Sequence, residues 1–139
     1  MAIEIDHLGI AVRSLEEGLR FYELTLGMTV TQTETVEVEQ VSIAMLPAGS
    51  AANAPRIELL EAVGADSTIA KFIEKRGPGL HHIALRVDNL AEAIDRLRQT
   101  GGRILNEPRR GAGGHLYSFV HPTSAGGVLV ELIQNEETA

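Results

Sequence analysis

Two histidines and two glutamates occupy matched positions in the two halves of this chain. His82 follows His7 by 75 positions (82 − 7), and Glu131 follows Glu58 by 73 (131 − 58). Two imidazoles and two carboxylates suit a six-coordinate divalent cation and leave positions for water or substrate. Burying four such groups in apolar strands without a cation would carry a large desolvation cost. The pattern therefore predicts one metal centre held by His7, Glu58, His82 and Glu131.

The ligand set also limits the choice of metal. The chain has no cysteine, so a thiolate site is excluded. We expect Co²⁺ or Mn²⁺ first, with Ni²⁺, Fe²⁺ and Mg²⁺ as alternatives. A single strand histidine or glutamate is more often an ordinary polar residue, and it is the repetition of the pair that favours ligation. Gly9 and Ala84, two residues beyond the histidines, leave room above the metal.

The four residues belong to an internal repeat. Residues 6–27 align with residues 81–102 without a gap. Each copy opens with period-two alternation, which predicts a strand with aliphatic side chains on one face and the histidine on the other. Helical spacing of apolar residues follows, after the capping residues Ser14 and Asn89, and it ends at glycine.

The rest of each copy is predicted to form three strands. They are expected at residues 29–34, 41–46 and 56–61 in the first copy and at residues 103–106, 116–120 and 128–134 in the second. The predicted fold class is α+β, with two tandem βαβββ modules forming a curved mixed β-sheet around the metal site. We expect a single domain over residues 1–139, with module one at about 4–64, a connector with a short helix at about 65–79, and module two at about 80–135.

Composition narrows the class of partner. The net charge of −7 disfavours nonspecific nucleic-acid binding, because a phosphate backbone would be repelled. No apolar run approaches the roughly 20 residues that span a bilayer, and no signal peptide is visible. We therefore expect a cytoplasmic protein that binds neither nucleic acid nor membrane.

A glycine-rich loop offers a second set of polar groups. It contains Arg109, Arg110, Gly113, Gly114 and His115. Its guanidinium groups and backbone N–H groups could hold a carboxylate or phosphates. An ordinary hairpin loop with solvated arginines is the alternative. His81 and His121 have no part in the main predicted ligand set, and ligation by His121 is an alternative.

Several segments resemble the vicinal oxygen chelate superfamily and, within it, the methylmalonyl-CoA epimerase family. The resemblance rests on the paired modules, on the order His, Glu, His, Glu, and on residues 6–12, 57–61, 66–85, 106–114 and 119–132. It implies an isomerase that interconverts (R)- and (S)-methylmalonyl-CoA by proton transfer at C2 through a metal-stabilised enolate. It also implies an acyl-CoA substrate and a homodimer.

The residues that transfer the proton are less clearly indicated. Some members of the family carry a non-ligand glutamate on the third strand, at the position of Ile43, which cannot transfer a proton. Glu131 and Glu58 are therefore the expected acid and base.

Three other functions fit the same fold. A glyoxalase I (lactoylglutathione lyase) type of isomerase would use the same metal ligands on a glutathione hemithioacetal. A ring-cleaving dioxygenase would leave more positions open on its metal, and a fourth ligand at Glu58 argues against it. A metal-free binding protein of the same fold would not need the full ligand set.

Overall fold

The computed structural model describes residues 2–134. These residues form two compact units. The N-terminal unit comprises residues 7–81, and the C-terminal unit comprises residues 2–6 together with residues 82–134. The first strand, β1 (Glu4–Ala11), begins in the C-terminal unit and continues into the N-terminal unit. No helix within residues 2–134 has both the length and the apolar character needed to cross a bilayer.

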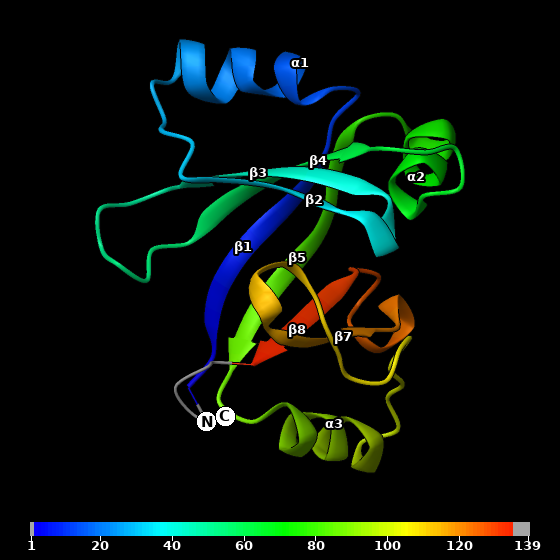
Figure 1. Cartoon of the computed structure of the whole chain (residues 1–139). Coiled ribbons are helices and arrows are strands. Elements are labelled where there is room, and N and C mark those ends of the chain that lie inside the picture. The colour runs from blue at the N-terminus through cyan, green and yellow to red at the C-terminus, as the bar shows by residue number, and fades with distance from the viewer. Residues whose placement is uncertain (1, 135–139) are drawn as a thin grey trace. The chain divides into compact units, whose positions relative to one another are not determined.

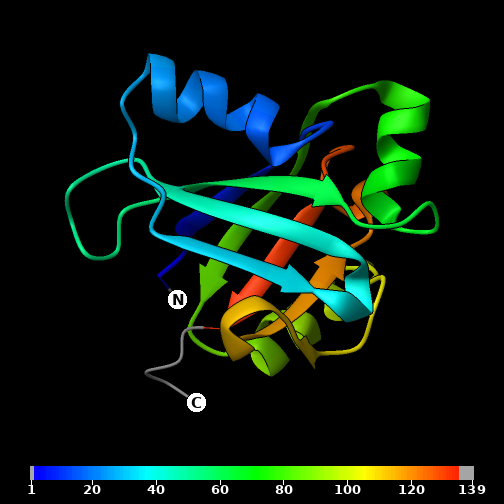
Figure 2. The same ribbon diagram turned by 45° about the horizontal axis from the view of Figure 1, so that its top comes forward.

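Four strands form the sheet of the N-terminal unit, in the order β2-β3-β4-β1. The last three in sequence are β2 (Gln32–Val36), β3 (Val41–Pro47) and β4 (Arg56–Ala62). Strand β3 pairs antiparallel with both β2 and β4, whereas β1 pairs parallel with β4. Figure 2 shows β2, β3 and β4 running side by side. The strand predicted at residues 29–34 corresponds to β2, which begins three residues later, at Gln32.

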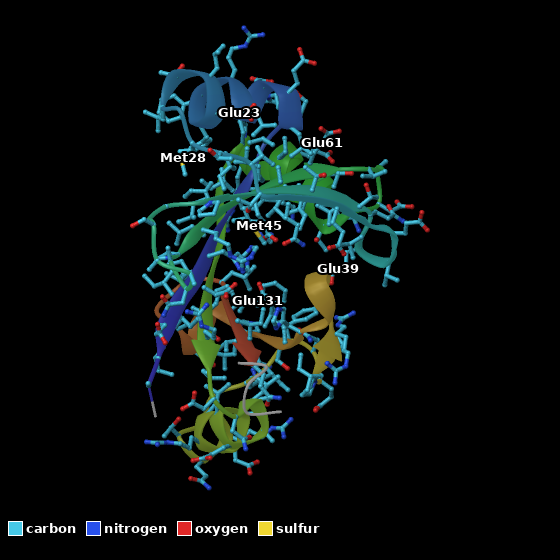
Figure 3. All side chains as sticks on the ribbon, turned by 60° about the vertical axis from the view of Figure 1, so that its left-hand side comes forward. Glu23, Met28, Glu39, Met45, Glu61 and Glu131 are labelled. Carbon is cyan, nitrogen blue, oxygen red and sulfur yellow. The ribbon has the colours of Figure 1, made fainter. Side chains whose placement is uncertain are left out.

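One helical segment covers this sheet (Figure 1). It begins as α1 (Leu15–Leu19), capped by the Ser14 hydroxyl, and continues as a π-helical segment (Arg20–Thr25). Apolar side chains of β3, β4 and the helix form the core beneath it, among them Ala44, Leu46 and Leu59. In Figure 3, Met28 lies on the helix side of the strands and Met45 on the opposite side. One face of β3 therefore packs in the core under the helix, and the other face points away from it.

The predicted connector helix is present as α2 (Thr68–Arg76) and belongs to the N-terminal unit. The Ser67 hydroxyl accepts a hydrogen bond from the backbone N–H of Ala70 and so caps it. The helix ends at Gly77, whose positive φ of 76° favours glycine. A 3₁₀ turn (Glu37–Glu39) connects β2 to β3.

The C-terminal unit repeats the same plan. Its elements are β5 (Gly79–Val87), which begins in the N-terminal unit, α3 (Leu90–Gln99), β6 (Arg109–Arg110), β7 (Leu116–Val120) and β8 (Val130–Gln134), with 3₁₀ turns at Ala112–Gly114 and Pro122–Ser124. The strand order is β5-β8-β7-β6, with β5 parallel to β8 and the other pairs antiparallel. The pairing matches that of the N-terminal unit, which confirms the predicted α+β class and the repeat.

One predicted strand is wrong. Residues 103–106 make only an isolated bridge, between Ile104 and Val120, and the short strand β6 lies further along the chain. The reason is a side chain that replaces a backbone acceptor. The Asn106 amide oxygen accepts the Phe119 backbone N–H at 2.9 Å, where a continuing strand would have used a carbonyl.

Candidate functional site

The N-terminal unit contains the first predicted histidine–glutamate pair. His7 lies on β1 and Glu58 on the neighbouring strand β4, where Glu58 is in register with Gly9. The His7 Nε2 and Glu58 Oε1 atoms are 3.2 Å apart. Both residues are buried, with 4% and 6% of their surface exposed. Their face of the sheet is the one opposite the α1 core, as the alternation predicted.

The C-terminal unit contains the second pair in the same arrangement. His82 lies on β5 and Glu131 on β8, and the atoms His82 Nε2 and Glu131 Oε1 are again 3.2 Å apart. These residues are 5% and 9% exposed. Glu131 is in register with Ala84 on one side and Phe119 on the other. The Phe119 ring packs edge-on against the His82 imidazole, with centroids 5.5 Å apart.

The chemistry of these pairs suits a divalent cation. Each unit brings one imidazole nitrogen and one carboxylate oxygen within 3.2 Å of each other in a buried environment. Histidine and glutamate are residue types that could hold a metal ion. The repeat is thus preserved at the level of individual atoms.

Each of the strands β4 and β8 also makes a hydrogen bond from its other face to the start of a helix. The sequence analysis did not predict these bonds. The Leu15 backbone N–H, at the start of α1, donates to Glu61 Oε1 at 2.6 Å. The Leu90 backbone N–H, at the start of α3, donates to Gln134 Oε1 at 3.0 Å. The signal was present in the repeat, because an acceptor side chain follows each predicted glutamate ligand by three residues. Figure 3 labels Glu61 on the helix side of the strands.

The surroundings of the first pair are mostly apolar. Met45 is in register with Glu58, and Ile43 with Leu60, and all these side chains are buried. The two glutamates nearest in sequence to β3, Glu37 and Glu39, belong to the 3₁₀ turn and not to a strand. These placements leave no carboxylate on β3 itself.

A further carboxylate, Glu34, was not singled out by the sequence. It stands opposite Ile43 on the neighbouring strand β2, and its Oε1 accepts a hydrogen bond from Gln32 Nε2 at 3.3 Å. Glu34 is half-buried.

The predicted substrate loop is tightly folded. Arg110 donates from its guanidinium to the Gly114 carbonyl at 2.7 Å, and the Gly111 backbone N–H donates to the His115 carbonyl at 3.0 Å. Gly113 and Gly114 have φ values of 73° and 80°, which residues other than glycine rarely adopt. The loop thus has a defined backbone held together by its own atoms.

The two remaining strand and loop histidines have structural contacts. His81 packs edge-on against Phe72 of α2, with ring centroids 5.0 Å apart. His121 Nδ1 accepts the backbone N–H of Thr123 at 3.2 Å and caps a 3₁₀ turn. The main predicted ligand set included neither, with ligation by His121 as an alternative, and these two contacts are structural ones.

Comparisons with known proteins identify the family. A model of the Glyoxalase/Bleomycin resistance protein/Dioxygenase superfamily matches residues 6–119. The ethylmalonyl-CoA/methylmalonyl-CoA epimerase of Cereibacter sphaeroides is 37% identical over 94% of this chain and 96% of its own length. The lactoylglutathione lyase of Salmonella typhimurium is 32% identical, over 94% of this chain and 92% of its own.

A solved structure gives the same result. A variant of the Streptomyces coelicolor methylmalonyl-CoA epimerase, in complex with 2-nitronate-propionyl-CoA, is 38% identical and superposes with a TM-score of 0.88. That match covers 94% of this chain and 96% of the other. With a family match over most of its length and relatives that cover nearly all of it, the chain belongs to the Glyoxalase/Bleomycin resistance protein/Dioxygenase superfamily.

Proposed function

We propose that this protein is a metal-dependent epimerase that interconverts (R)- and (S)-methylmalonyl-CoA. The observation that carries the proposal is the repeated, buried histidine–glutamate pair in a chain whose relatives include epimerases of methylmalonyl-CoA. The Streptomyces coelicolor relative was solved with an acyl-CoA analogue, which supports an acyl-CoA substrate here.

We assign both pairs to one divalent cation. His7, Glu58, His82 and Glu131 would supply two neutral imidazole nitrogens and two anionic oxygens, which together balance the charge of the ion. Co²⁺ and Mn²⁺ are the expected metals, because both accept such a mixed set with positions left over. When bound, the cation supplies a positive charge that stabilises the negative charge developing on the thioester oxygen.

Glu131 and Glu58 are the proposed proton-transfer groups. Epimerisation removes the proton at C2 on one face and returns one on the other, which requires two groups that exchange roles. One oxygen of each carboxylate lies against its histidine, so proton transfer falls to the other oxygen or to a loosened ligand. The equivalence of the two glutamates in the repeat supports giving them opposite faces of the reacting carbon.

The loop from Arg109 to His115 is the proposed substrate-binding segment. Its backbone N–H groups and guanidinium groups suit the carboxylate or the phosphates of an acyl-CoA. Its own hydrogen bonds hold it in one conformation before the substrate arrives, which lowers the entropic cost of binding.

We also propose a cytoplasmic homodimer. The lack of cysteine suits a reducing compartment, where disulfides are rare. Three large apolar side chains, Phe21, Leu24 and Leu26, are exposed on the π-helical segment and at its end. Such a group of exposed apolar side chains is typical of a protein–protein interface.

A glyoxalase I type of isomerase is the second candidate. The similarity to the Salmonella typhimurium lactoylglutathione lyase favours it, although at a lower identity than the epimerases. Both reactions require a cation and a carboxylate base. Substrate turnover separates them, since only the lyase consumes methylglyoxal with glutathione.

The decisive experiment measures deuterium incorporation at C2 of methylmalonyl-CoA in D₂O. We expect exchange from both enantiomers, its loss after removal of metal by a chelator, and its return with Co²⁺ or Mn²⁺. Turnover of methylglyoxal plus glutathione without exchange into methylmalonyl-CoA would refute the epimerase. Full exchange in a sample shown by elemental analysis to be free of metal would refute the metal centre.

A further inference from the structure

The strands of the C-terminal unit align one row of side chains across the sheet. Arg86 on β5 is in register with Ile133 on β8, Ile133 with Tyr117 on β7, and Tyr117 with Arg109 on β6. Glu131 is two residues before Ile133, so the row lies on the same face as Glu131. The sheet thus presents two arginines, Arg86 and Arg109, on the face that carries the second histidine–glutamate pair.

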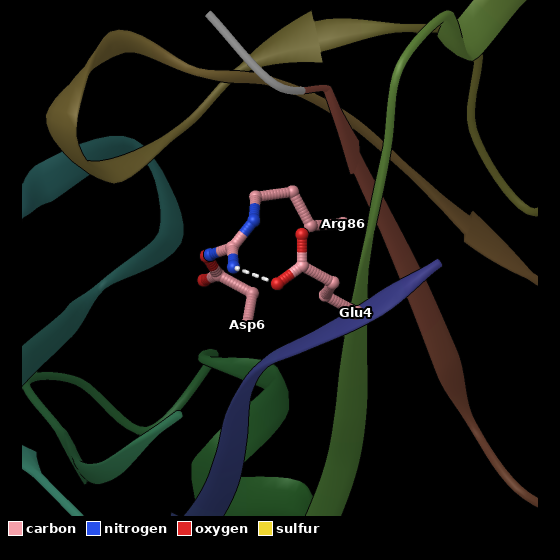
Figure 4. Close-up of polar contacts among 3 residues, drawn as sticks. All are labelled: Glu4, Asp6 and Arg86. Carbon is pink, nitrogen blue, oxygen red and sulfur yellow. Dashed lines mark hydrogen bonds and ion pairs between the residues drawn. The ribbon is translucent and has the colours of Figure 1, made fainter. Parts of the chain in front are cut away.

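The first of these arginines is already neutralised. Arg86 donates to Asp6 Oδ1 at 2.8 Å and lies 3.5 Å from Glu4 Oε2 (Figure 4). Asp6 is buried, and the guanidinium is largely covered. The Asp6 carboxylate alone balances its charge and Glu4 adds a second negative charge nearby, so Arg86 has the position of a structural ion pair.

Arg110 differs from Arg109 in the face of the sheet that it occupies and in its contacts. Successive residues of a strand point to opposite faces, so Arg110 lies on the other face from Arg109. Its guanidinium holds the Gly114 carbonyl and closes the loop. Of the two loop arginines, only Arg109 belongs to the face of Glu131.

Arg109 is exposed and rests on an aromatic side chain. Its Cζ lies 5.8 Å from the centre of the Tyr117 ring, within range of a cation–π contact. No ion pair joins it to a carboxylate of residues 2–134. The Tyr117 ring packs edge-on against Phe119 at 5.7 Å, and Phe119 packs against His82 at 5.5 Å. A continuous set of ring contacts therefore leads from the proposed metal ligand to an exposed guanidinium.

Arg109 lies on the last strand of the C-terminal unit, away from the strand that carries Glu131. Arg109 stands two strands and two residues from Glu131, so their Cα atoms are about 12 Å apart by strand geometry. A substrate carboxylate bound beside Glu131 would lie two strands inward of Arg109, so the guanidinium over Tyr117 better suits an anion further from the reacting carbon. The other anions of an acyl-CoA are its phosphates, which the long pantetheine arm separates from the thioester.

We propose that Arg109, whose guanidinium packs against the Tyr117 ring, binds a phosphate of the coenzyme A portion of the substrate. This contact would make the protein selective for CoA thioesters over pantetheine thioesters, which lack the phosphates. The inference rests on the proposed acyl-CoA substrate. Tyr117 is buried and holds the guanidinium through its ring, while the guanidinium keeps its N–H donors for phosphate oxygens.

The test compares Arg109→Leu with the wild type on two substrates, methylmalonyl-CoA and methylmalonyl-pantetheine, which lacks all phosphates. The matched control is Arg98→Leu, which removes an exposed arginine of α3 paired with Glu107. Losing one charged hydrogen-bonding contact should raise KM for the CoA substrate about tenfold, with little change in kcat. The penalty should largely disappear with the pantetheine substrate, and it should shrink at high salt.

Three results would overturn the inference. Equal penalties on both substrates would place Arg109 on the reacting end. No penalty on either substrate would leave it a solvated residue, and an equal penalty in Arg98→Leu would make the effect one of overall charge. Direct binding of free CoA separates this inference from the proposed function. If no thioester is epimerised but CoA binds and Arg109→Leu weakens that binding tenfold, the reaction is wrong and the phosphate contact stands.

Discussion

The hydrogen bond from the Leu15 backbone N–H to Glu61 Oε1 offers a direct test of how the glutamate-bearing strand is held. The first N–H groups of a helix have no partner within the helix, and here one of them finds a half-buried side chain 46 residues later at 2.6 Å. Replacing Glu61 with alanine removes the acceptor and leaves that N–H to solvent or without a partner. The expected cost in the free energy of unfolding is about 1.5 kcal/mol, at the lower end for a charged hydrogen bond because Glu61 is partly exposed.

The second module supplies the control. Gln134 makes the equivalent bond to Leu90 at 3.0 Å without a charge. Glu61→Gln should therefore keep the bond and lose only the favourable interaction of a carboxylate with the helix N-terminus, about 0.5 kcal/mol. Gln134→Ala should cost about 1 kcal/mol, as for an ordinary neutral hydrogen bond.

Urea unfolding followed by circular dichroism measures these differences. On thermal unfolding, the loss in Glu61→Ala should lower Tm by about 5 °C. The reasoning is refuted if Glu61→Ala unfolds at the same urea concentration as the wild type. It is also refuted if Glu61→Gln is as destabilised as Glu61→Ala, because then the charge and not the acceptor oxygen would be what matters.

Three further predictions follow from other contacts. The Ser118 hydroxyl is fully buried and has no hydrogen-bond partner within residues 2–134, so Ser118→Ala should raise the free energy of unfolding by about 1 kcal/mol. A lower free energy of unfolding in urea would contradict this. Arg86→Leu leaves Asp6 buried without its guanidinium and should cost about 3 kcal/mol in the same assay, whereas the exposed pair lost in Arg98→Leu should cost under about 0.5 kcal/mol. Glu58→Gln keeps an oxygen ligand but loses the carboxylate base, so metal content should persist while deuterium exchange from one enantiomer falls at least about a hundredfold. Exchange from both enantiomers at the wild-type rates would exclude Glu58 as a base.

Periodicity made most of the fold predictable. Strand alternation and helix caps are local signals, and the repeat doubled each of them, so that the caps Ser14 and Asn89 were both placed correctly. The same alternation assigned each histidine to the face opposite its helix. These features depend on neighbours in sequence, and a single sequence records them.

What the sequence could not reveal depends on side chains that meet from distant segments. Asn106 replaces a backbone acceptor, residues 103–106 form only an isolated bridge, and nothing in the local sequence distinguishes Asn106 from a strand residue. The segment after Leu19 has the apolar spacing of an α-helix but widens into a π-helical turn. The placement of Glu34 opposite Ile43 was not foreseen, because only strand pairing defines that register. The equal standing of Arg109 and Arg110 in the sequence was likewise resolved by strand register.

The spacing within the last strand of each module explains why one short segment can serve two purposes. Residues three apart in a strand point to opposite faces, so Glu58 and Glu61 separate, as do Glu131 and Gln134. The position facing the helix tolerates either an acid or an amide, because a backbone N–H needs only an oxygen acceptor. The position facing the histidine is a glutamate in both modules, although an amide there would also have offered an oxygen. Two carboxylates would balance the charge of the proposed divalent cation, whereas an amide oxygen, as in Glu58→Gln, would coordinate the ion without contributing to that balance.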